Sequence, residues 1–469
     1  MCDEAANLCG IEPALRDDLG SEGGFFLDDD PNTAHWARET FGQHDAEVTC
    51  VPLASPGVEE MLPEVLTEMR PLTAAFADAG FSLYLVGGIV RDIHLGVPIA
   101  DLDFDLTTQA RPEQIRALVA PLSEAVWGQG ERFGTIGCRI SGRPYEITTH
   151  RAESYPDASR KPEVVFGDDI EVDLSRRDFT VNAMAVDSSD GSLLDPFHGL
   201  EALRDRVLVT PIAPEVSFSD DPLRILRAAR FIARLDLAVA DEVRLAAVDL
   251  IDRMSIVSEE RIRDEFDKLL AAPQPSKGLR FLSAVGAWQY VASSIEVQEL
   301  VELGSDLDRS RVDRDLRRLV TFSRTAPSER AAQLDSLRYS NSESREMRLV
   351  LAGFDLVAIA AEKFEASTVR RLLGRVGYES MSELLELLDV RQVPDRGLGD
   401  LLIGLADQED LTNLRPELSG EDIMDLLGIV PGPEVGAALS VLQERRFEEG
   451  PLDRASEVAY LLEKYRRRS

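Results

Sequence analysis

The stretch Leu85-Val-Gly-Gly-Ile-Val-Arg-Asp92 constrains the fold of this chain more than any other segment. An apolar run, residues 83–86, stops at two glycines and continues in a pattern that predicts the start of a helix. Glycine lets the backbone approach an anion, and the free N–H groups of a first helical turn point toward it. The sequence therefore predicts a strand, a tight turn and a helix, with Gly87 and Gly88 forming a seat for phosphate.

An acidic segment, Asp101-Leu-Asp-Phe-Asp-Leu-Thr-Thr108, follows shortly after. In a strand, alternate side chains share a face, so Asp101, Asp103 and Asp105 are predicted to project from one side. Three neighbouring carboxylates repel one another unless a cation lies among them. Mg²⁺ takes one or two carboxylates together with substrate phosphate oxygens, and two such ions can clamp a phosphoryl or nucleotidyl displacement. Taken alone, either segment has a plainer alternative: an ordinary turn, or a solvated or Ca²⁺-binding edge.

Together the two segments resemble the head of the class II nucleotidyltransferase superfamily, which comprises tRNA CCA-adding enzymes and bacterial poly(A) polymerases. The family pattern continues into Ala110-Arg-Pro-Glu113. The resemblance implies that Arg91 and Asp92, on the helix after the glycines, belong to the nucleotide site. It also implies two metal ligands, for which two alignments remain open. Counting forward from the glycines selects Asp101 and Asp103, whereas counting back from Thr107 and Thr108 selects Asp103 and Asp105.

A second motif of this family is Arg176-Arg-Asp-Phe-Thr-Val-Asn-Ala-Met-Ala185. Adjacent arginines before an aspartate suit a triphosphate and a ribose. Arg177 can fork onto phosphate oxygens, while Asp178 accepts a hydrogen bond from a sugar hydroxyl. Asn182 is expected to brace the loop. The alternative is a charged helix cap without a ligand.

The segment from Asp220 to Arg234 is predicted to be a helix that opens with aspartate at the cap and proline at the first position. Helical spacing then places a polar stripe on one face, made of Asp221, Arg224, Arg227 and Arg230. The segment resembles the family's nucleotide-selecting Glu-Asp-x-x-Arg element, with Asp220 in place of the glutamate. A carboxylate that accepts from an exocyclic amine and an arginine that donates to ring acceptors would select cytosine and adenine. An ordinary salt-bridged helix face is the alternative.

The charge of the chain is unusual for a protein that binds nucleic acid, because the net charge is −34. Residues 1–60 carry part of this excess and are expected to be a largely disordered extension. The cations are 46 arginines against five lysines, and arginine is the better fork for phosphate. The four cysteines are scattered, which argues against a disulfide framework or a zinc site. Because no targeting segment or long apolar run is present, we expect a soluble cytoplasmic protein without a membrane partner.

Further segments complete the expected organisation. A helix is predicted for residues 62–79, and a hairpin for residues 133–151, where Glu146 is either a third carboxylate or a surface residue. His150 is expected to be structural. Residues 258–270 are expected to form a capped structural helix. No histidine follows His198, so the His-Asp phosphohydrolase activity of some relatives is not expected in the helical region. Residues 420–436 resemble the family's tail motif, either as an RNA contact or as a simple helix turn.

The resulting prediction is an α/β nucleotidyltransferase head with a small mixed sheet, followed by all-helical domains. The predicted parts are the extension (1–60), the head (61–210), a helical neck with the selecting helix (211–275), a helical body (276–400) and an RNA-binding tail (401–469). The predicted function is Mg²⁺-dependent addition of CCA to the 3′ end of tRNA from CTP and ATP, with release of pyrophosphate. The alternatives are poly(A) synthesis, addition of only C or only A, and a non-catalytic nucleotide or RNA binder. The retained carboxylates argue against the last of these.

Overall fold

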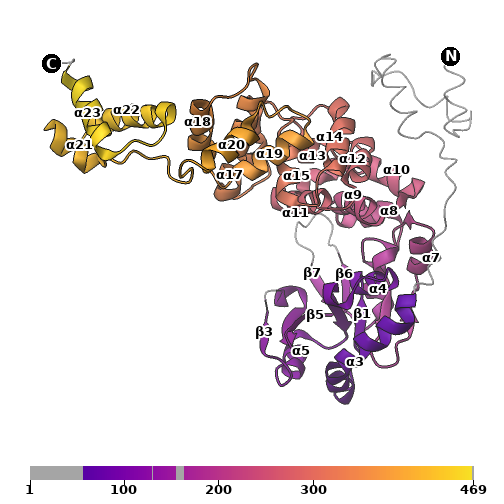
Figure 1. Ribbon diagram of the computed structural model, residues 1–469. Coiled ribbons are helices and arrows are strands. Elements are labelled where there is room, and N and C mark those ends of the chain that lie inside the picture. The colour runs from indigo at the N-terminus through magenta and orange to yellow at the C-terminus, as the bar shows by residue number, and fades with distance from the viewer. Residues whose placement is uncertain (1–55, 129, 155–162, 467–469) are drawn as a thin grey trace, which may run out of the picture. The chain divides into compact units, whose positions relative to one another are not determined.

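The structure is a computed structural model that describes residues 56–128, 130–154 and 163–466 (Figure 1). Most of the predicted acidic extension, residues 1–55, lies outside the described residues. Helix α3 spans Pro56–Asp78 and therefore begins six residues before the predicted start at Leu62. Val58, which the prediction had left in the extension, packs with Met61 against the core of the head, so the earlier start buries additional apolar surface.

The head contains a seven-stranded mixed sheet in the order β3-β4-β5-β2-β1-β8-β9. Strands β2 and β5 run parallel, and the other neighbouring pairs run antiparallel. The strands span Tyr84–Val86 (β1), Phe104–Thr108 (β2), Ala125–Trp127 (β3), Thr135–Ile140 (β4), Arg143–Thr149 (β5), Ala185–Asp187 (β8) and Leu193–Leu194 (β9). The predicted hairpin is confirmed: β4 and β5 are joined by Ser141 and Gly142, both with positive φ.

One face of this sheet is covered by helices. Side chains of α3, α4 (Gly88–His94) and α5 (Pro112–Val119) share one apolar cluster with the strands. Leu106 of β2 and Ile147 of β5 point into that cluster and are buried. Because side chains alternate along a strand, their neighbours Asp105 and Glu146 face the other side of the sheet. The acidic groups therefore face away from the helical layer.

The remaining elements of the head connect the sheet to the helical region. They are the hairpin of β6 (Arg151–Ser154) and β7 (Glu163–Phe166), the short helices α6 (Ile170–Ser175) and α7 (Gly199–Arg204), and the two-stranded pairing of β10 (Val207–Leu208) with β11 (Ala238–Val239). The motif residues 176–185 lie between α6 and β8 and include a single 3₁₀ turn, Thr180–Asn182.

Beyond residue 210 the described chain is helical apart from β11, and its helices follow one another from α8 to α23 (Figure 1). They span Pro214–Asp220 (α8), Arg224–Leu235 (α9), Asp241–Asp249 (α10), Glu259–Leu270 (α11), Pro275–Ala284 (α12), Gln289–Ala292 (α13), Leu300–Arg309 (α14), Arg314–Phe322 (α15), Pro327–Ser336 (α16), Asn341–Ala358 (α17), Ala366–Val376 (α18), Met381–Val390 (α19), Leu398–Ala406 (α20), Gly420–Leu427 (α21), Pro433–Glu449 (α22) and Arg454–Arg466 (α23). The predicted fold class, a mixed sheet followed by helical parts, is confirmed.

The cores of the helical region differ in extent. One continuous apolar cluster runs from Phe179 to Leu414, so the segments that we predicted as neck and body share their core. Helices α21, α22 and α23 have a smaller cluster of their own, which includes Ile423, Leu442 and Leu461. None of the described helices combines the length and the apolar composition needed to cross a membrane.

Candidate active site

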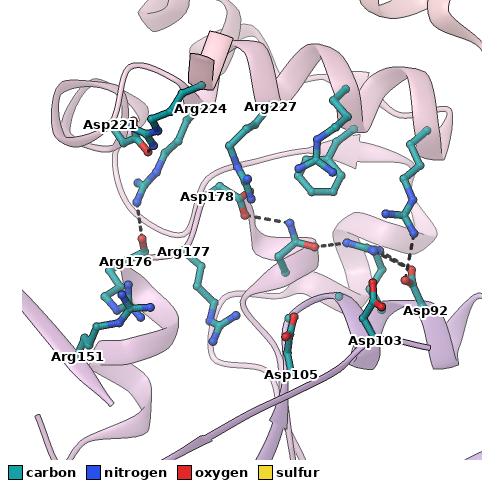
Figure 2. A pocket seen from close by; sticks show the side chains of 18 residues that line it. Asp92, Asp103, Asp105, Arg151, Arg176, Arg177, Asp178, Asp221, Arg224 and Arg227 are labelled. Atoms are coloured by element: carbon teal, nitrogen blue, oxygen red, sulfur yellow. Dashed lines mark hydrogen bonds and ion pairs between the residues drawn. The ribbon is translucent and has the colours of Figure 1, made fainter. Parts of the chain in front are cut away.

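A cavity of about 450 Å³ brings together most of the predicted site residues. Figure 2 shows Asp103 and Asp105 on the sheet side of this cavity, across from Arg224 and Arg227. The cavity is lined by Gly87, Gly88, Arg91, Asp92, Asp103, Asp105, Arg151, Arg176, Arg177, Asp178, Asn182, Asp221, Arg224, Arg227, Arg230, Phe231, Arg234 and Arg261. Of the residues predicted for the site, only Asp101 and Asp220 are absent from this lining. Nine arginines face five aspartates here, so the cavity carries a positive charge in a strongly acidic chain.

The glycine turn has the predicted form. Strand β1 ends at Val86, Gly87 has φ 72° and ψ −125°, and α4 begins at Gly88. This conformation is strained for a residue with a side chain. A Cβ atom at Gly87 would also lie only 2.7 Å from Arg177 Nη1. The turn thus depends on glycine for its backbone angles and for the close approach of a guanidinium.

The acidic segment differs from the prediction at its beginning. Asp101 lies at the end of a 3₁₀ turn, Ile99–Asp101, and strand β2 starts only at Phe104. The prediction of one strand from residue 101 is therefore wrong, because the chain turns before it joins the sheet. Asp103 immediately precedes the strand and Asp105 lies within it. These two aspartates line the cavity, and Asp101 does not.

Asp105 lies in an unusually acidic environment. The parallel pairing of β2 with β5 places it opposite Glu146. Burial, followed by repulsion from Glu146, raises the pKa of Asp105 to about 6; Asp103 adds to this rise and Arg177 opposes it. A bound cation would relieve this repulsion. In the described residues no group of three or more acidic, histidine or cysteine side chains is arranged to hold a metal ion. Two carboxylates with open positions for phosphate oxygens nevertheless suit Mg²⁺.

His150 has the structural position that we expected. Its ring lies within hydrogen-bond distance of Thr107 Oγ1 (2.8 Å), and the residue is buried. Burial lowers the pKa of His150, so the ring is neutral near pH 7. It supports the strand that carries Asp105 and does not line the cavity.

The two arginines of the second motif are anchored by one buried carboxylate. Arg176 donates to Asp173 Oδ1 through Nε (3.1 Å) and Nη2 (2.8 Å), and Arg177 Nη2 donates to Asp173 Oδ2 (3.2 Å). Arg177 Nε is buried and has no hydrogen-bond partner among the described residues. A buried donor without a partner is costly, and it lies in a side chain that lines the cavity. Arg177 is therefore equipped to bind an anion.

Asp178 accepts more hydrogen bonds from protein groups than we predicted. Its Oδ1 accepts from Phe179 N and Asn182 Nδ2, and its Oδ2 accepts from Arg227 Nε and Nη2. Burial alone would raise the pKa of Asp178, but the charge of Arg227 and these hydrogen bonds lower it to about 2. Because four protein donors occupy this carboxylate, its geometry favours holding Arg227 over the predicted bond to a sugar hydroxyl.

Asn182 braces the loop, as we expected, and joins it to the glycine turn. It accepts from Arg91 Nη1 and donates to Asp178 (2.9 Å). Arg91 Nε in turn donates to Asp92 Oδ1 (2.8 Å), whose second oxygen accepts from Arg234 Nη2 of α9 (3.2 Å). This series of bonds, part of which is drawn in Figure 2, links the head to the helical region around the cavity.

The predicted selecting helix begins later than the sequence suggested. Asp220 is the last residue of α8, and α9 starts at Arg224. Asp221 Oδ1 accepts from Leu223 N (3.2 Å), which stabilises a turn over Pro222 and Leu223 in place of a helical turn. The prediction that aspartate and proline open this helix is therefore wrong, and Asp220, which we matched to the family's glutamate, does not line the cavity.

The rest of the stripe lies along the cavity as predicted. Arg224 Nη1 donates to Ser217 Oγ (2.7 Å), and its Nη2 donates to the carbonyl of Arg176 (Figure 2). Arg227 bonds Asp178, and Arg230 Nε donates to Glu265 Oε2 of α11 (2.7 Å). Glu265 is buried, which agrees with the structural role expected for residues 258–270. Ser258 occupies the cap position of α11 without a side-chain bond, so the predicted cap interaction does not form.

Five cavity residues were not among the predicted site residues: Arg151, Arg176, Phe231, Arg234 and Arg261. Arg234 follows Arg227 and Arg230 at helical spacing, so extending the stripe by one turn would have found it. Phe231 lies beneath the Arg230 guanidinium, whose carbon is 4.3 Å from the ring centroid. Arg261 forms an ion pair with Asp221 (2.9 Å), a contact between distant segments that no local pattern indicates.

Comparison with known proteins identifies the family of this chain. A family model described as the poly A polymerase head domain matches residues 83–209, and one described as the probable RNA and SrmB-binding site of polymerase A matches residues 236–298. The CCA-adding enzyme of Streptococcus gordonii is 32% identical over 415 residues, which cover 86% of this chain and 99% of that protein. The chain belongs to the CCA-adding enzyme family. The resemblance indicated by the motifs is thereby confirmed.

Other relatives support the same family. The CCA-adding enzyme of Lactobacillus delbrueckii subsp. bulgaricus is 30% identical over 80% of this chain and 92% of its own length. Among solved structures, the Bacillus stearothermophilus CCA-adding enzyme in complex with CTP has a TM-score of 0.70 and 26% identity, covering 88% of this chain and 99% of that one. A Thermotoga maritima CCA-adding enzyme complexed with tRNA_CCA shares the fold, with a TM-score of 0.57 and 21% identity over 87% of this chain and 98% of that one.

Proposed function

We propose that this member of the CCA-adding enzyme family adds C, C and A to the 3′ end of tRNA, using CTP and ATP and releasing pyrophosphate. The observation that carries the proposal is the cavity itself. It combines a carboxylate pair, Asp103 and Asp105, with nine arginines in a chain whose net charge is −34. A positive cavity in an acidic protein suits a small, highly charged anion such as a nucleoside triphosphate.

In the proposed reaction the RNA 3′-OH attacks the α-phosphorus of the bound triphosphate, and the bond to pyrophosphate breaks. Asp103 and Asp105 would hold Mg²⁺, which supplies charge neutralisation for the attacking and leaving oxygens. The raised pKa of Asp105 is the observation that fits this pair to a cation. Asp101 lies outside the cavity, so we assign the metal to the other two aspartates.

The arginines would bind and orient the triphosphate. Arg177 lines the cavity with its Nη1 beside Gly87, so its guanidinium can bind phosphate at the glycine turn. Asp178 and Glu265 hold Arg227 from two sides, which keeps that guanidinium at the cavity wall. Asp92 and Arg91 act through the bonds that join the turn to Asn182.

Base selection is assigned to Asp221 and Arg224. The carboxylate of Asp221 can accept from the N4 amine of cytosine or the N6 amine of adenine, while an arginine donates to the adjacent ring nitrogen. Uracil and guanine present a carbonyl at the same place. Both side chains line the cavity, and Arg261 holds the Asp221 carboxylate from α11. We assign RNA binding to the helical region, where the second family model matches residues 236–298.

The test uses a tRNA transcript that ends at the discriminator base. The transcript is incubated with purified protein and Mg²⁺, with CTP and ATP separately and together, and the 3′ end is read at single-nucleotide resolution. Growth by three nucleotides only when both triphosphates are present supports the proposal. Long tails from ATP alone on unstructured RNA would indicate a poly(A) polymerase, and arrest after only C or only A would indicate a partial adder. Absence of any addition would favour a non-catalytic binder.

A further inference from the structure

The carboxylate of Asp173 lies directly behind the phosphate-binding arginines of the cavity. Asp173 is on α6, has no solvent exposure and does not line the cavity. Its two oxygens accept from the side chains of Arg176 and Arg177. Oδ1 also accepts from the backbone N–H of Arg151, a third cavity residue (3.0 Å). One buried group therefore contacts three arginine residues that line the same cavity.

Such an anchor has a physical purpose. Two adjacent guanidiniums repel each other, and each long side chain loses rotamer entropy when it is held in one position. A carboxylate between them offsets the repulsion and orders both side chains before a ligand arrives. Burial would raise the pKa of Asp173, but Arg177 and then Arg176 keep it well below its usual range, so the group stays charged.

The bond to Asp173 also determines where the Arg177 guanidinium lies. Arg177 acts electrostatically on Asp105 across the cavity as well as bonding Asp173. Asp173 Oδ2 holds one edge of the guanidinium, and Nη1 is kept beside Gly87. If Asp173 lost its charge, the guanidinium of Arg177 would lose the ion pair that holds this edge. The phosphate-binding donors would then leave their place at the glycine turn.

We propose that Asp173 is a positioning residue for the triphosphate, which pre-organises Arg176 and Arg177 at the cavity wall. The inference rests on the proposed function, because it names how that site holds its substrate. Asp173 contacts the phosphate-binding side chains and no group that faces the base. Its effect should therefore fall equally on CTP and ATP and appear in binding, with little change in turnover at saturation.

The test begins with the wild-type chain, which must extend the tRNA transcript with CTP and ATP; failure there would refute the proposed function and not the role of Asp173. Binding of inorganic tripolyphosphate, CTP and ATP is then measured by calorimetry for wild type and Asp173→Asn, together with KM and kcat. Loss of the group that orients a metal ligand typically costs roughly 10- to 100-fold in affinity or activity, and Asp173 orients phosphate-binding side chains in a comparable way. We expect a weakening of that size, equal for all three ligands, with kcat changed only a few-fold.

A double-mutant cycle separates positioning from mere folding. In an Arg177→Ala background, Asp173→Asn should lose most of its effect on tripolyphosphate binding, because the side chain that it positions is gone. The matched control is Asp306→Asn: Asp306 is also buried and also pairs with arginines, but it lies on α14, away from the cavity. This variant should lower the melting temperature and leave tripolyphosphate affinity unchanged.

Three results would overturn the inference: unchanged ligand affinity in folded Asp173→Asn, a loss confined to kcat, or an effect that adds fully to that of Arg177→Ala. Should Asp173→Asn fail to fold, Asp173→Glu provides the second measurement. It keeps the charge but displaces the carboxylate by one methylene, so it should still weaken tripolyphosphate binding. Wild-type affinity in folded Asp173→Glu would contradict the role.

Discussion

Arg177 in the cavity and Arg317 in the helical body differ in how far their guanidinium groups are satisfied by protein contacts. Arg177 Nη2 donates to Asp173 Oδ2. Arg177 leaves a buried Nε donor without a partner among the described residues, beside the glycine turn. Arg317 donates to Ser310 Oγ (3.0 Å), to the Ser310 carbonyl (3.3 Å), and to the carbonyls of Leu270 (2.6 Å) and Ala272. Its guanidinium is fully buried and satisfies the carbonyl groups at the end of α11.

A similar contrast appears between other arginines of the two regions. In the body, Arg330 has a complete set of partners, namely the Phe322 and Thr325 carbonyls and both oxygens of Asp355. Arg324 and Arg391 of the body also keep a buried Nε without a hydrogen-bond partner among the described residues, but neither lines the cavity. The number of arginines therefore does not identify a binding site. A binding site is indicated where an arginine that lines a cavity has an incomplete set of hydrogen-bond partners.

The largest expected effect is at the carboxylate pair. Asp103→Ala and Asp105→Ala should each lower nucleotide addition by on the order of 10³-fold, because metal charge stabilisation is worth several kcal/mol. Melting temperatures should stay close to wild type, because these two carboxylates are proposed to bind the metal and not to stabilise the fold. Asp101→Ala, outside the cavity, should keep near-normal activity. Incorporation of labelled CMP into a tRNA transcript measures all three, and near-normal turnover of Asp103→Ala would refute the site.

Exchanging the two arginines for alanine tests the comparison directly. Arg317→Ala leaves buried carbonyl and hydroxyl oxygens without donors, each costing about 1–3 kcal/mol, so stability should fall by about 3 kcal/mol or more. Arg177→Ala should raise KM for CTP and ATP, and its loss of stability should be smaller than that of Arg317→Ala, because Arg176 and the Arg151 N–H still bond Asp173. Thermal melts and steady-state kinetics are recorded on both variants. If Arg177→Ala proved the less stable and Arg317→Ala the weaker binder, the distinction between the regions would be wrong.

Asp178 lines the cavity, but its contacts resemble those of a structural residue. A variant of Asp178 therefore tests whether a cavity residue can contribute mainly to stability. The pKa of Asp178 is about 2 in the folded chain against about 3.9 when unfolded, a difference equivalent to roughly 2–3 kcal/mol. A lowered folded pKa stabilises the protein above about pH 4, and this contribution is lost as pH falls toward 2. Asp178→Asn should therefore be less stable than wild type at pH 7, and the gap should narrow between pH 5 and 3. Urea midpoints across that range test this; a constant gap would contradict it.

Base discrimination should change by a smaller factor. Asp221→Ala or Arg224→Ala should reduce the preference for CTP and ATP over UTP and GTP by about 1–3 kcal/mol, the usual worth of a base-reading pair. Triphosphate binding itself should weaken less, since neither residue is placed at the phosphates. Competition assays with all four triphosphates measure the preference. Arg317→Ala serves as the control and should leave it unchanged, whereas an unaltered preference in both cavity variants would exclude this assignment.

The smallest effect is expected at the glycine turn. Gly87→Ala introduces a positive-φ strain of about 1 kcal/mol and places a methyl group against Arg177. KM for both triphosphates should rise by about tenfold, since 1.4 kcal/mol corresponds to that factor. Gly80→Ala is the matched control, because Gly80 has φ 82° with no atom within 4 Å of the added methyl. It should carry the backbone strain without the rise in KM; equal KM values for the two variants would show that Arg177 is not involved.

Local order was predictable from the sequence because neighbouring residues encode it. The strand, Gly87 turn and α4 follow from an apolar run that ends at two glycines, and the hairpin follows from Ser141 and Gly142 between alternating segments. The spacing of Arg224, Arg227 and Arg230 is enough to place these side chains on one face of α9. Each of these features depends on residues within a few positions of one another, where sterics and periodicity decide.

Contacts between distant segments were decided only by the tertiary structure. Two alignments of the aspartates were equally compatible with the sequence, and our proposal of Asp103 and Asp105 rests on the 3₁₀ turn at Asp101 and on the lining of the cavity. The ion pair of Arg234 with Asp92 joins residues 142 positions apart. Such contacts depend on how the sheet packs against the helical region. No local pattern carries that information, since the attraction between two charges is set by their distance in space and by their burial.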